Sequence, residues 1–273
     1  MGKNLRLIIK NVHDTGYVTA TSEALPAAYS QRSARVKPWR SVGTDPQTLT
    51  TALPKAEYID SVVIYRHNLT GSATARLRLF KSGVEVRDTG VVASSDIIPL
   101  GVFRFGVDPW GATTTGAVPI QQIAFWIPLT LADEYRITIN DPTNPDNCLE
   151  IGRIIAGETF SPKFNPSYDL TLEWQEASEH RRTEGGSLRT VGDDSLARRL
   201  PIDLNWLDAR DRRKLSDQLL RIGKRGDVYI SVFPEKGGLD EAEYAFLGRR
   251  ENDYSHTHNF YNNWKSQLVW IEV

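Results

Sequence analysis

The stretch Ser61-Val62-Val63-Ile64-Tyr65, followed by Ala75-Arg76-Leu77-Arg78-Leu79-Phe80, decides the expected fold of this chain. The first run is rich in β-branched residues, which predicts a strand. The second run alternates apolar residues with Arg76 and Arg78, so one face of its strand should meet solvent. Glycines recur between residues 71 and 116 at turn-like intervals. Short strands joined by irregular loops are typical of an antiparallel sandwich.

Further runs extend this pattern, and they are Ile123 to Trp126, Tyr135 to Ile139, Gly152 to Ala156 and Leu170 to Trp174. No helix-period stripe of useful length occurs before residue 200. The segment from Phe103 to Pro119 is polar, glycine-rich and aperiodic, which indicates an extended surface loop. We therefore expect a mainly β chain whose first domain, residues 1–178, is a jelly-roll β-sandwich.

A change of composition between Glu176 and Asp194, rich in charge, Gly and Ser, favours an exposed arm or a connection between domains. We place a domain boundary near residue 178. The second, smaller domain would span residues 179–273 and begin with an arm at 179–195. Four strands are expected in it, and they are Arg199 to Trp206, Val228 to Phe233, Tyr244 to Leu247 and Ser266 to Val273.

One amphipathic helix is expected within this second domain. Asp208 is its predicted N-cap, and Gly223 follows where a left-handed C-cap is wanted. Leu215, Leu219 and Ile222 form the apolar stripe. In the strand before the helix, Trp206 is expected to point inward with Leu200, Ile202 and Leu204, and Gly237-Gly238 is expected to form a turn.

Composition excludes several classes of function. Lys and Arg number 33 against 34 Asp and Glu in 273 residues, so no net field would attract nucleic acid or an anionic membrane. No apolar run approaches the length of a membrane span, and the start of the chain lacks the apolar run of a signal peptide. We expect synthesis in the cytoplasm, no secretion by a signal peptide and no membrane insertion. The one cysteine, Cys148, is expected to be a small buried thiol.

The motifs of catalysis and cofactor binding are missing. The sequence has no Gly-x-Ser-x-Gly nucleophile motif and no phosphate-binding loop ending in Gly-Lys-Ser or Gly-Lys-Thr. His256-x-His258 has a spacing that can chelate zinc, but no third ligand is marked. The turn-forming stretch Asp141 to Asn147 offers oxygen ligands of the kind that calcium uses. We expect no enzyme activity, no cofactor and no metal site.

Three residues are candidates for a ligand. Trp110, in the glycine-rich loop, presents an aromatic face that can stack on a sugar ring. His67 and Asn68 follow the strand that ends at Tyr65 and form a polar pair at the rim of the sandwich, although Asn is also a common cap of a strand-ending turn.

Several segments together resemble a known family: Trp39-Arg40-Ser41, Val62 to Leu69, Arg136 to Pro145 and Leu149 to Ile154. Residues 1–175 resemble the galactose-binding-like, discoidin-type jelly roll found in tail proteins of long-tailed bacteriophages. The second half is similar to the small sheet-plus-helix domains of phage tail tube, distal tail and baseplate proteins, which form rings. In distal tail proteins the ring domain comes first, the reverse of the order here.

This resemblance implies a structural component of a phage tail tip or baseplate, located in the virion. Its expected partners are its own copies in a ring, and tube, hub, tape-measure-associated or fibre proteins of the tail, with host glycan as a further ligand. The expected interface residues are Arg181, Arg182, Arg189, Val269 and Ile271. Two alternatives remain, a carbohydrate-binding adhesion module and a glycan-cleaving tail enzyme.

Overall fold

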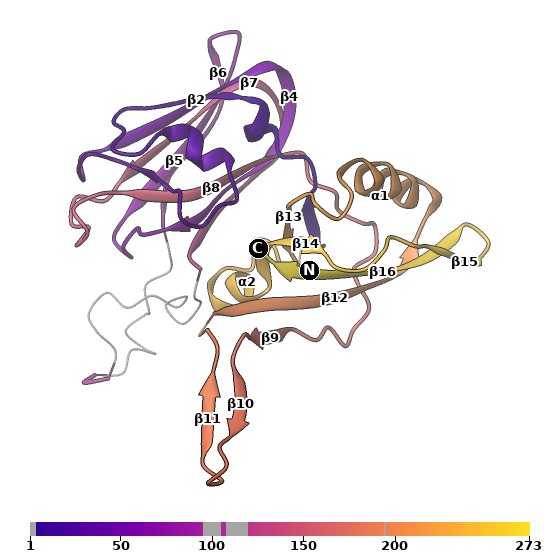
Figure 1. Ribbon diagram of the computed structural model, residues 1–273. Helices are drawn as coiled ribbons and strands as arrows, with labels where there is room; N and C mark the ends of the chain where they lie inside the picture. The colour runs from indigo at the N-terminus through magenta and orange to yellow at the C-terminus, as the bar shows by residue number, and fades with distance from the viewer. Residues whose placement is uncertain (1–3, 95–104, 108–119, 194) are drawn as a thin grey trace. The chain divides into compact units, whose positions relative to one another are not determined.

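The computed structural model describes residues 4–94, 105–107, 120–193 and 195–273 of the chain (Figure 1). Strands dominate these residues, so the predicted mainly β class is confirmed. The chain forms two compact units. The first unit comprises Met1–Ser161 and Val228–Ala245, and the second comprises Pro162–Asp227 and Phe246–Val273.

A curled antiparallel sheet forms the body of the first unit. Its strand order is β3 (Trp39–Arg40), β8 (Glu150–Gly157), β4 (Gln47–His67), β7 (Gln122–Asn140), β5 (Thr74–Lys81) and β6 (Val84–Ala93), with β2 (Tyr17–Ala20) also paired to β4. The two runs predicted as separate strands, Ile123 to Trp126 and Tyr135 to Ile139, are parts of one 19-residue strand β7. Register shifts against β4 let the long strand bend without ending.

The core of the first unit lies inside this curled sheet. Leu77 and Leu79 of β5 are fully buried, while Arg76, which precedes Leu77, is half-exposed and pairs with Asp88 of β6. This alternation confirms the inward and outward faces predicted for β5. Two 3₁₀ helices, Val12–Thr15 and Ala27–Gln31, also contribute buried residues to this unit.

Residues 228–245 belong to the first unit because β13 (Val228–Ser231) pairs antiparallel with β1 (Arg6–Ile8). The ring of Tyr229 packs edge-on against Tyr65, with 6.4 Å between centroids. The first unit therefore breaks off at residue 161 rather than at the predicted 178, and it is completed by a later piece of the chain. The predicted turn at Gly237-Gly238 is wrong in part, because Gly238 begins the short helix α2 (Gly238–Glu243).

The second unit contains β14 (Ala245–Arg250), β16 (Asn263–Glu272), β12 (Leu196–Leu207) and β9 (Glu173–Glu176), paired in that order, with β15 (Thr257–Phe260) forming a hairpin with β16. The predicted helix is confirmed as α1 (Ala209–Ile222). The side chain of Asp208 accepts a hydrogen bond from the Asp211 backbone N–H at 2.8 Å, and Gly223 has a φ of 63°. Leu215 and Leu219 are its buried residues.

The inward orientation predicted for Trp206 is wrong. The side chain of Trp206 is 56% exposed, while Leu207 after it is fully buried. Between Leu204 and Leu207 the register of β12 against β16 shifts, and this irregularity interrupts the alternation of the strand.

The predicted arm forms a separate two-stranded sheet in the second unit, made of β10 (Glu179–Arg182) and β11 (Leu188–Val191) (Figure 1). We call the hairpin from Glu179 to Val191 the arm. No helix in the described ranges is long and apolar enough to cross a membrane.

Candidate functional site

His67 and Asn68, two of the three predicted ligand residues, line one hollow of about 310 Å³ in the first unit, which we call the rim hollow. Its other lining residues are Arg35, Pro38, Arg66, Ile120, Gln121, Glu150 and Gly152. Trp110 lies outside the described residues.

The amide of Asn68 is committed to the fold. Its Nδ2 donates to Asp146 Oδ2 at 2.8 Å and to the Cys148 carbonyl at 2.9 Å, and its Oδ1 accepts from the Glu150 N–H at 2.8 Å. Both amide hydrogens are used in this way. Asn68 therefore joins the end of β4 to the chain before β8, as expected of an Asn that caps a turn.

The imidazole of His67 is half-buried, and its Nδ1 accepts a hydrogen bond from the Leu69 N–H at 3.2 Å. Burial lowers the pKa of His67 to about 4, against the opposing effects of a hydrogen bond with the Gln122 backbone and the charge of Asp141. The ring is therefore neutral near pH 7, and it offers a ligand no charge.

The charged groups of the rim hollow come from residues that the sequence analysis missed. Arg66 has a φ of 59°, rare for a residue with a side chain, and its Nη2 donates to the Ser33 carbonyl at 3.2 Å. A Cβ on Gly152 would lie 3.0 Å from the Arg66 Cβ, so this glycine leaves room for Arg66. Arg35 and Glu150 complete the hollow, and guanidinium and carboxylate groups can together bind hydroxyls. A local sequence pattern does not reveal these three charged residues, because three separate segments of the chain supply them.

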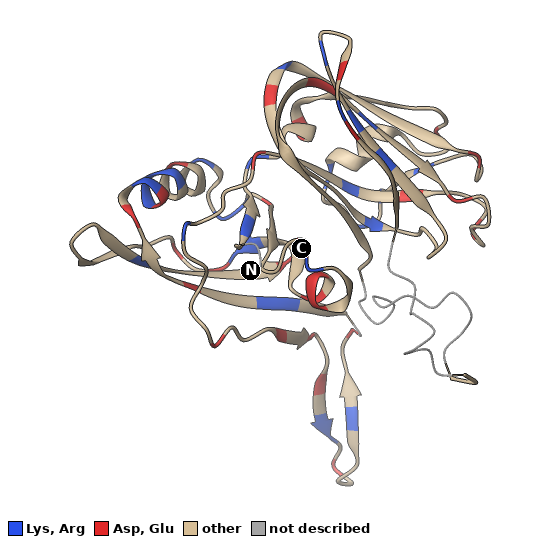
Figure 2. Cartoon of the chain, turned by 180° about the vertical axis from the view of Figure 1, so that it is seen from behind, with Lys and Arg blue, Asp and Glu red and all other residues tan. Residues whose placement is uncertain are grey.

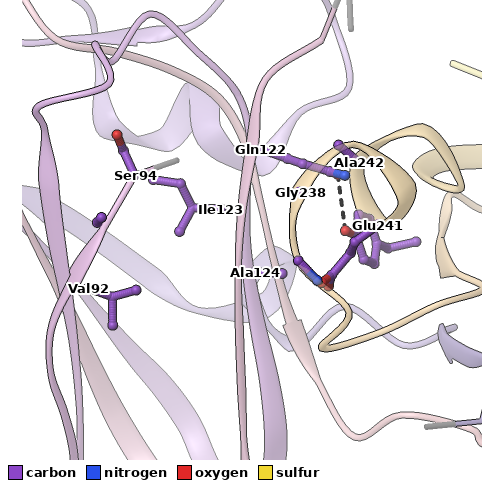
Figure 3. Close-up of a pocket in the computed structure, with 11 residues that line it drawn as sticks. Val92, Ser94, Gln122, Ile123, Ala124, Gly238, Glu241 and Ala242 are labelled. Carbon is purple, nitrogen blue, oxygen red and sulfur yellow. Dashed lines mark hydrogen bonds between the residues drawn. The ribbon is translucent and has the colours of Figure 1, made fainter. Parts of the chain in front are cut away.

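A second hollow of the first unit, of about 240 Å³, lies between the ends of β6 and β7 and helix α2 (Figure 3). Its polar groups bond to one another. The Tyr229 hydroxyl donates to Gln122 Oε1 at 3.0 Å, and Glu241 accepts from Trp126 Nε1 and from the Gly237 N–H, each at 2.9 Å. These contacts attach residues 228–245 to β7, which is a structural role.

The two sequence patterns considered for metals have structural roles as well. The buried carboxylate of Asp141 accepts hydrogen bonds from the Thr70 N–H and hydroxyl and from Asn144 Nδ2, at 2.8, 2.7 and 3.0 Å. The His258 ring stacks on Trp264 with 4.8 Å between centroids. Within the described ranges no three His, Cys, Asp or Glu side chains gather in a way that could hold a metal ion.

The arm carries three of the five predicted interface residues. Arg181, Arg182 and Arg189 are exposed, and Arg181 lies directly opposite Arg189 in the two-stranded sheet. Arg181 pairs with Glu179 at 3.1 Å, and Arg182 Nη1 donates to the Gly186 carbonyl at 3.1 Å. Figure 2 shows Lys and Arg positions on both strands of the hairpin.

The other two predicted interface residues, Val269 and Ile271, lie in β16. This strand pairs with β12 on one side and β14 on the other, so its backbone is not at a free edge. Val269 is 6% exposed, and Ile271 is half-buried. The final strand is thus fixed in the sheet of its own unit.

No protein-family model matches the chain, and no curated protein matches it. Solved structures that are similar include CpGH89CBM32-5 from Clostridium perfringens in complex with GalNAc-β-1,3-galactose, at 12% identity and a TM-score of 0.39, covering 55% of this chain and 100% of that one. A Streptococcus pneumoniae fucose binding module, SpX-3, has 10% identity, a TM-score of 0.39 and coverages of 55% and 98%. Chitosan-binding module 1 of a Paenibacillus chitosanase/glucanase has 18% identity, a TM-score of 0.38 and coverages of 55% and 99%.

These three structures are sugar-binding modules, and none of them supports the resemblance to phage tail proteins. Their TM-scores lie below 0.5, so the likeness carries no argument about this chain. The galactose-binding-like subclass and the tail-tip role both stay predictions.

Proposed function

We propose that this chain is a non-catalytic assembly protein that binds neighbouring copies of itself through the arm. One observation carries the proposal. All eight strand residues of β10 and β11 are exposed, and among the described residues these strands pair only with each other. A lone two-stranded hairpin is marginally stable in water, so contact with a partner would stabilise it.

The side chains of the arm indicate the kind of partner. Arg181 faces Arg189 across the hairpin, and like charges directly opposite each other are destabilising. An acidic surface on a neighbour would relieve this repulsion. Leu188 and Val191 are 56% and 50% exposed, which adds apolar area for the same contact.

The base of the arm is closely packed. Gly192 has a φ of 134°, and a Cβ at this position would lie 2.5 Å from the Ala177 carbonyl oxygen. At the tip, the Thr183 N–H donates to the Ser187 carbonyl at 2.9 Å. These two contacts restrict the hairpin at its base and at its tip, which lowers the conformational entropy that the arm would lose on binding.

The tail-tip context rests on the sequence resemblance. An arm that binds a different surface of the next copy makes a heterologous contact, and such contacts form a ring when the rotation closes. A ring of this kind would fit the expected tail tip, with tube, hub, tape-measure-associated or fibre proteins as its neighbours.

The test measures the mass of the full chain by light scattering over a wide concentration range. We expect oligomers, and we expect the double variant Arg181→Glu with Arg189→Glu to shift the midpoint of assembly to at least tenfold higher concentration. A charge-matched control replaces two exposed arginines of α1, Arg210→Glu with Arg213→Glu. A monomeric full chain at every concentration, or equal assembly of the arm variant and the unsubstituted chain, would contradict the proposal.

Glycan binding is the second candidate, and the rim hollow favours it. Arg35 and Arg66 beside Glu150 offer donors and an acceptor for sugar hydroxyls. Among the described residues, Glu150 is the one carboxylate that lines the rim hollow, and Glu241 the one that lines the second hollow, whereas glycosidases use two facing carboxyl groups. The geometry thus favours binding over cleavage.

A glycan array tests this candidate. We expect Arg35→Ala to abolish the signal, with Arg32→Ala, a nearby exposed arginine, as the control. The variant Trp110→Ala reports on the aromatic residue predicted from the sequence. Binding that survives both Arg35→Ala and Trp110→Ala would count against a glycan site formed by these residues.

A further inference from the structure

Four exposed aromatic side chains lie at one end of the sheet of the second unit. The exposed fractions are 56% for Trp206, 65% for Phe260, 97% for Tyr261 and 98% for Tyr168. We call these four residues, with the β15–β16 turn, the aromatic end. Hydrophobic side chains this exposed are unremarkable singly, but a group of them marks an interaction site.

Three hydrogen bonds bring these segments together. Asn263, the first residue of β16 and the partner of Phe260 across the hairpin, donates through Nδ2 to the Asn205 carbonyl at 3.1 Å. The Asn205 side chain donates to Ser167 Oγ at 2.5 Å, and the Ser167 N–H donates to the Asp203 carbonyl at 3.0 Å. Trp206 follows Asn205, and Tyr168 follows Ser167, so all four rings belong to one region.

The irregularity in β12 orients Trp206. Leu204 pairs with Ser266 and Leu207 pairs with Trp264, so β12 has one more residue than β16 between the two pairs. This bulge puts Leu207 into the core and Trp206 outside it. Bulges often redirect a side chain next to a functional site.

Trp264, at the same end of the sheet, differs from the four exposed rings because other side chains cover its ring. His258 stacks on its ring, and the Arg212 guanidinium lies 4.9 Å from its centroid. Among the described residues, none of the four exposed rings has a stacking or cation contact of this kind. Their faces are therefore available to a ligand.

The turn that carries Phe260 and Tyr261 is polar but uncharged. The segment Thr257–Asn263 contains three asparagines and no Lys, Arg, Asp or Glu. It also lacks the aliphatic side chains that would complete an apolar protein interface. Flat rings pack well on the C–H faces of a pyranose, and amides both donate to and accept from its hydroxyls.

We propose that the aromatic end is a binding site for a neutral oligosaccharide. Trp206 and Tyr261 supply stacking faces, and Asn259 and Asn262 supply hydrogen bonds. The proposal is independent of the arm and of the rim hollow, because it uses residues of neither.

The test is calorimetric titration of the full chain with neutral hexasaccharides, namely cellohexaose, chitohexaose and maltohexaose. We expect at least one to bind, and we expect Trp206→Ala and Tyr261→Ala each to lower its association constant at least tenfold. Trp206→Phe, which keeps a ring, should retain most of the binding. Tyr17→Ala, which removes a 74% exposed tyrosine of the first unit, is the matched control.

Thermal unfolding of each variant shows whether the fold persists, which is expected because both side chains are exposed. Three results would overturn the proposal: no binding of any of the three sugars, binding that the alanine variants leave unchanged, or self-association that both variants abolish in the absence of sugar binding. A failure of assembly through the arm would not contradict the proposed oligosaccharide site, because the two proposals use different residues.

Discussion

His13 is fully buried in the first unit and belongs to a chain of hydrogen bonds. Ser30 Oγ donates to the Ala27 carbonyl at 2.7 Å, so it accepts from His13 Nε2 at 2.9 Å. Nδ1 then accepts from the Tyr135 hydroxyl at 2.5 Å. This arrangement holds a neutral imidazole. Burial, with the charge of Arg153 as a smaller cause, lowers the pKa of His13 from 6.5 to about 3.

The first prediction concerns pH. The unfolded chain binds a proton at His13 below about pH 6.5, whereas the folded chain resists it until about pH 3. The stabilisation is therefore complete above pH 6.5 and is lost as pH falls toward 3, by up to about 1.4 kcal/mol per pH unit. Urea unfolding between pH 4 and 7 measures how the free energy of unfolding changes with pH. The variant His13→Gln should flatten the pH dependence of the free energy of unfolding. The control His180→Gln, in the exposed arm, should leave that pH dependence unchanged.

The second prediction concerns a buried ion pair of the second unit. Arg198 and Glu272 have side chains only 1% and 2% exposed, and Arg198 Nε donates to Glu272 Oε2 at 2.9 Å. Glu272→Gln would leave a buried guanidinium without its counter-charge, at a cost of about 3–5 kcal/mol. The apolar pair Arg198→Met with Glu272→Leu should restore much of this loss. Urea unfolding that ranks the double variant below Glu272→Gln would contradict this account.

At the scale of elements, the arm and the bulge of β12 show how backbone geometry presents side chains. Gly192 lets β11 approach the chain before β10, and the bulge turns Trp206 outward. Each places side chains where a partner can reach them.

The third prediction tests the base of the arm. Gly192→Ala puts a Cβ within 2.5 Å of a backbone oxygen and strains a positive φ, so the arm must shift at its base. We expect weaker assembly in light scattering and faster amide exchange in β10 and β11. Gly185→Ala, whose Cβ meets nothing within 4 Å, is the control and should behave as the unsubstituted chain. Equal assembly of both variants would show that the orientation of the arm does not matter.

At the scale of the whole molecule, the first unit is discontinuous in sequence, since residues 228–245 return to it after most of the second unit. The pairing of β13 with β1 and the contact of Tyr229 with Tyr65 hold this piece in place. Complete folding of the first unit therefore requires residues 228–245, which follow most of the second unit in the sequence.

The fourth prediction follows from this discontinuity. A fragment of residues 1–178, cut at the boundary expected from composition, lacks β13 and exposes the edge of β1 and the ring of Tyr65. We expect it to unfold at lower urea concentration than the first unit of the full chain and to bind a hydrophobic dye. Tryptophan fluorescence follows the unfolding, and a fragment as stable as the full chain would refute the role given to residues 228–245.

The amino-acid sequence by itself determined the mainly β class, the faces of β5 and the bounds and caps of α1. These features depend on local periodicity and on capping residues such as Asp208 and Gly223, which act within a few positions of themselves. Tertiary structure alone decided that Trp206 points outward, that Arg35 and Arg66 join His67 in one hollow, and that residues 228–245 complete the first unit. Each of these depends on pairing between segments distant in sequence, and no local pattern records which strand will be the partner.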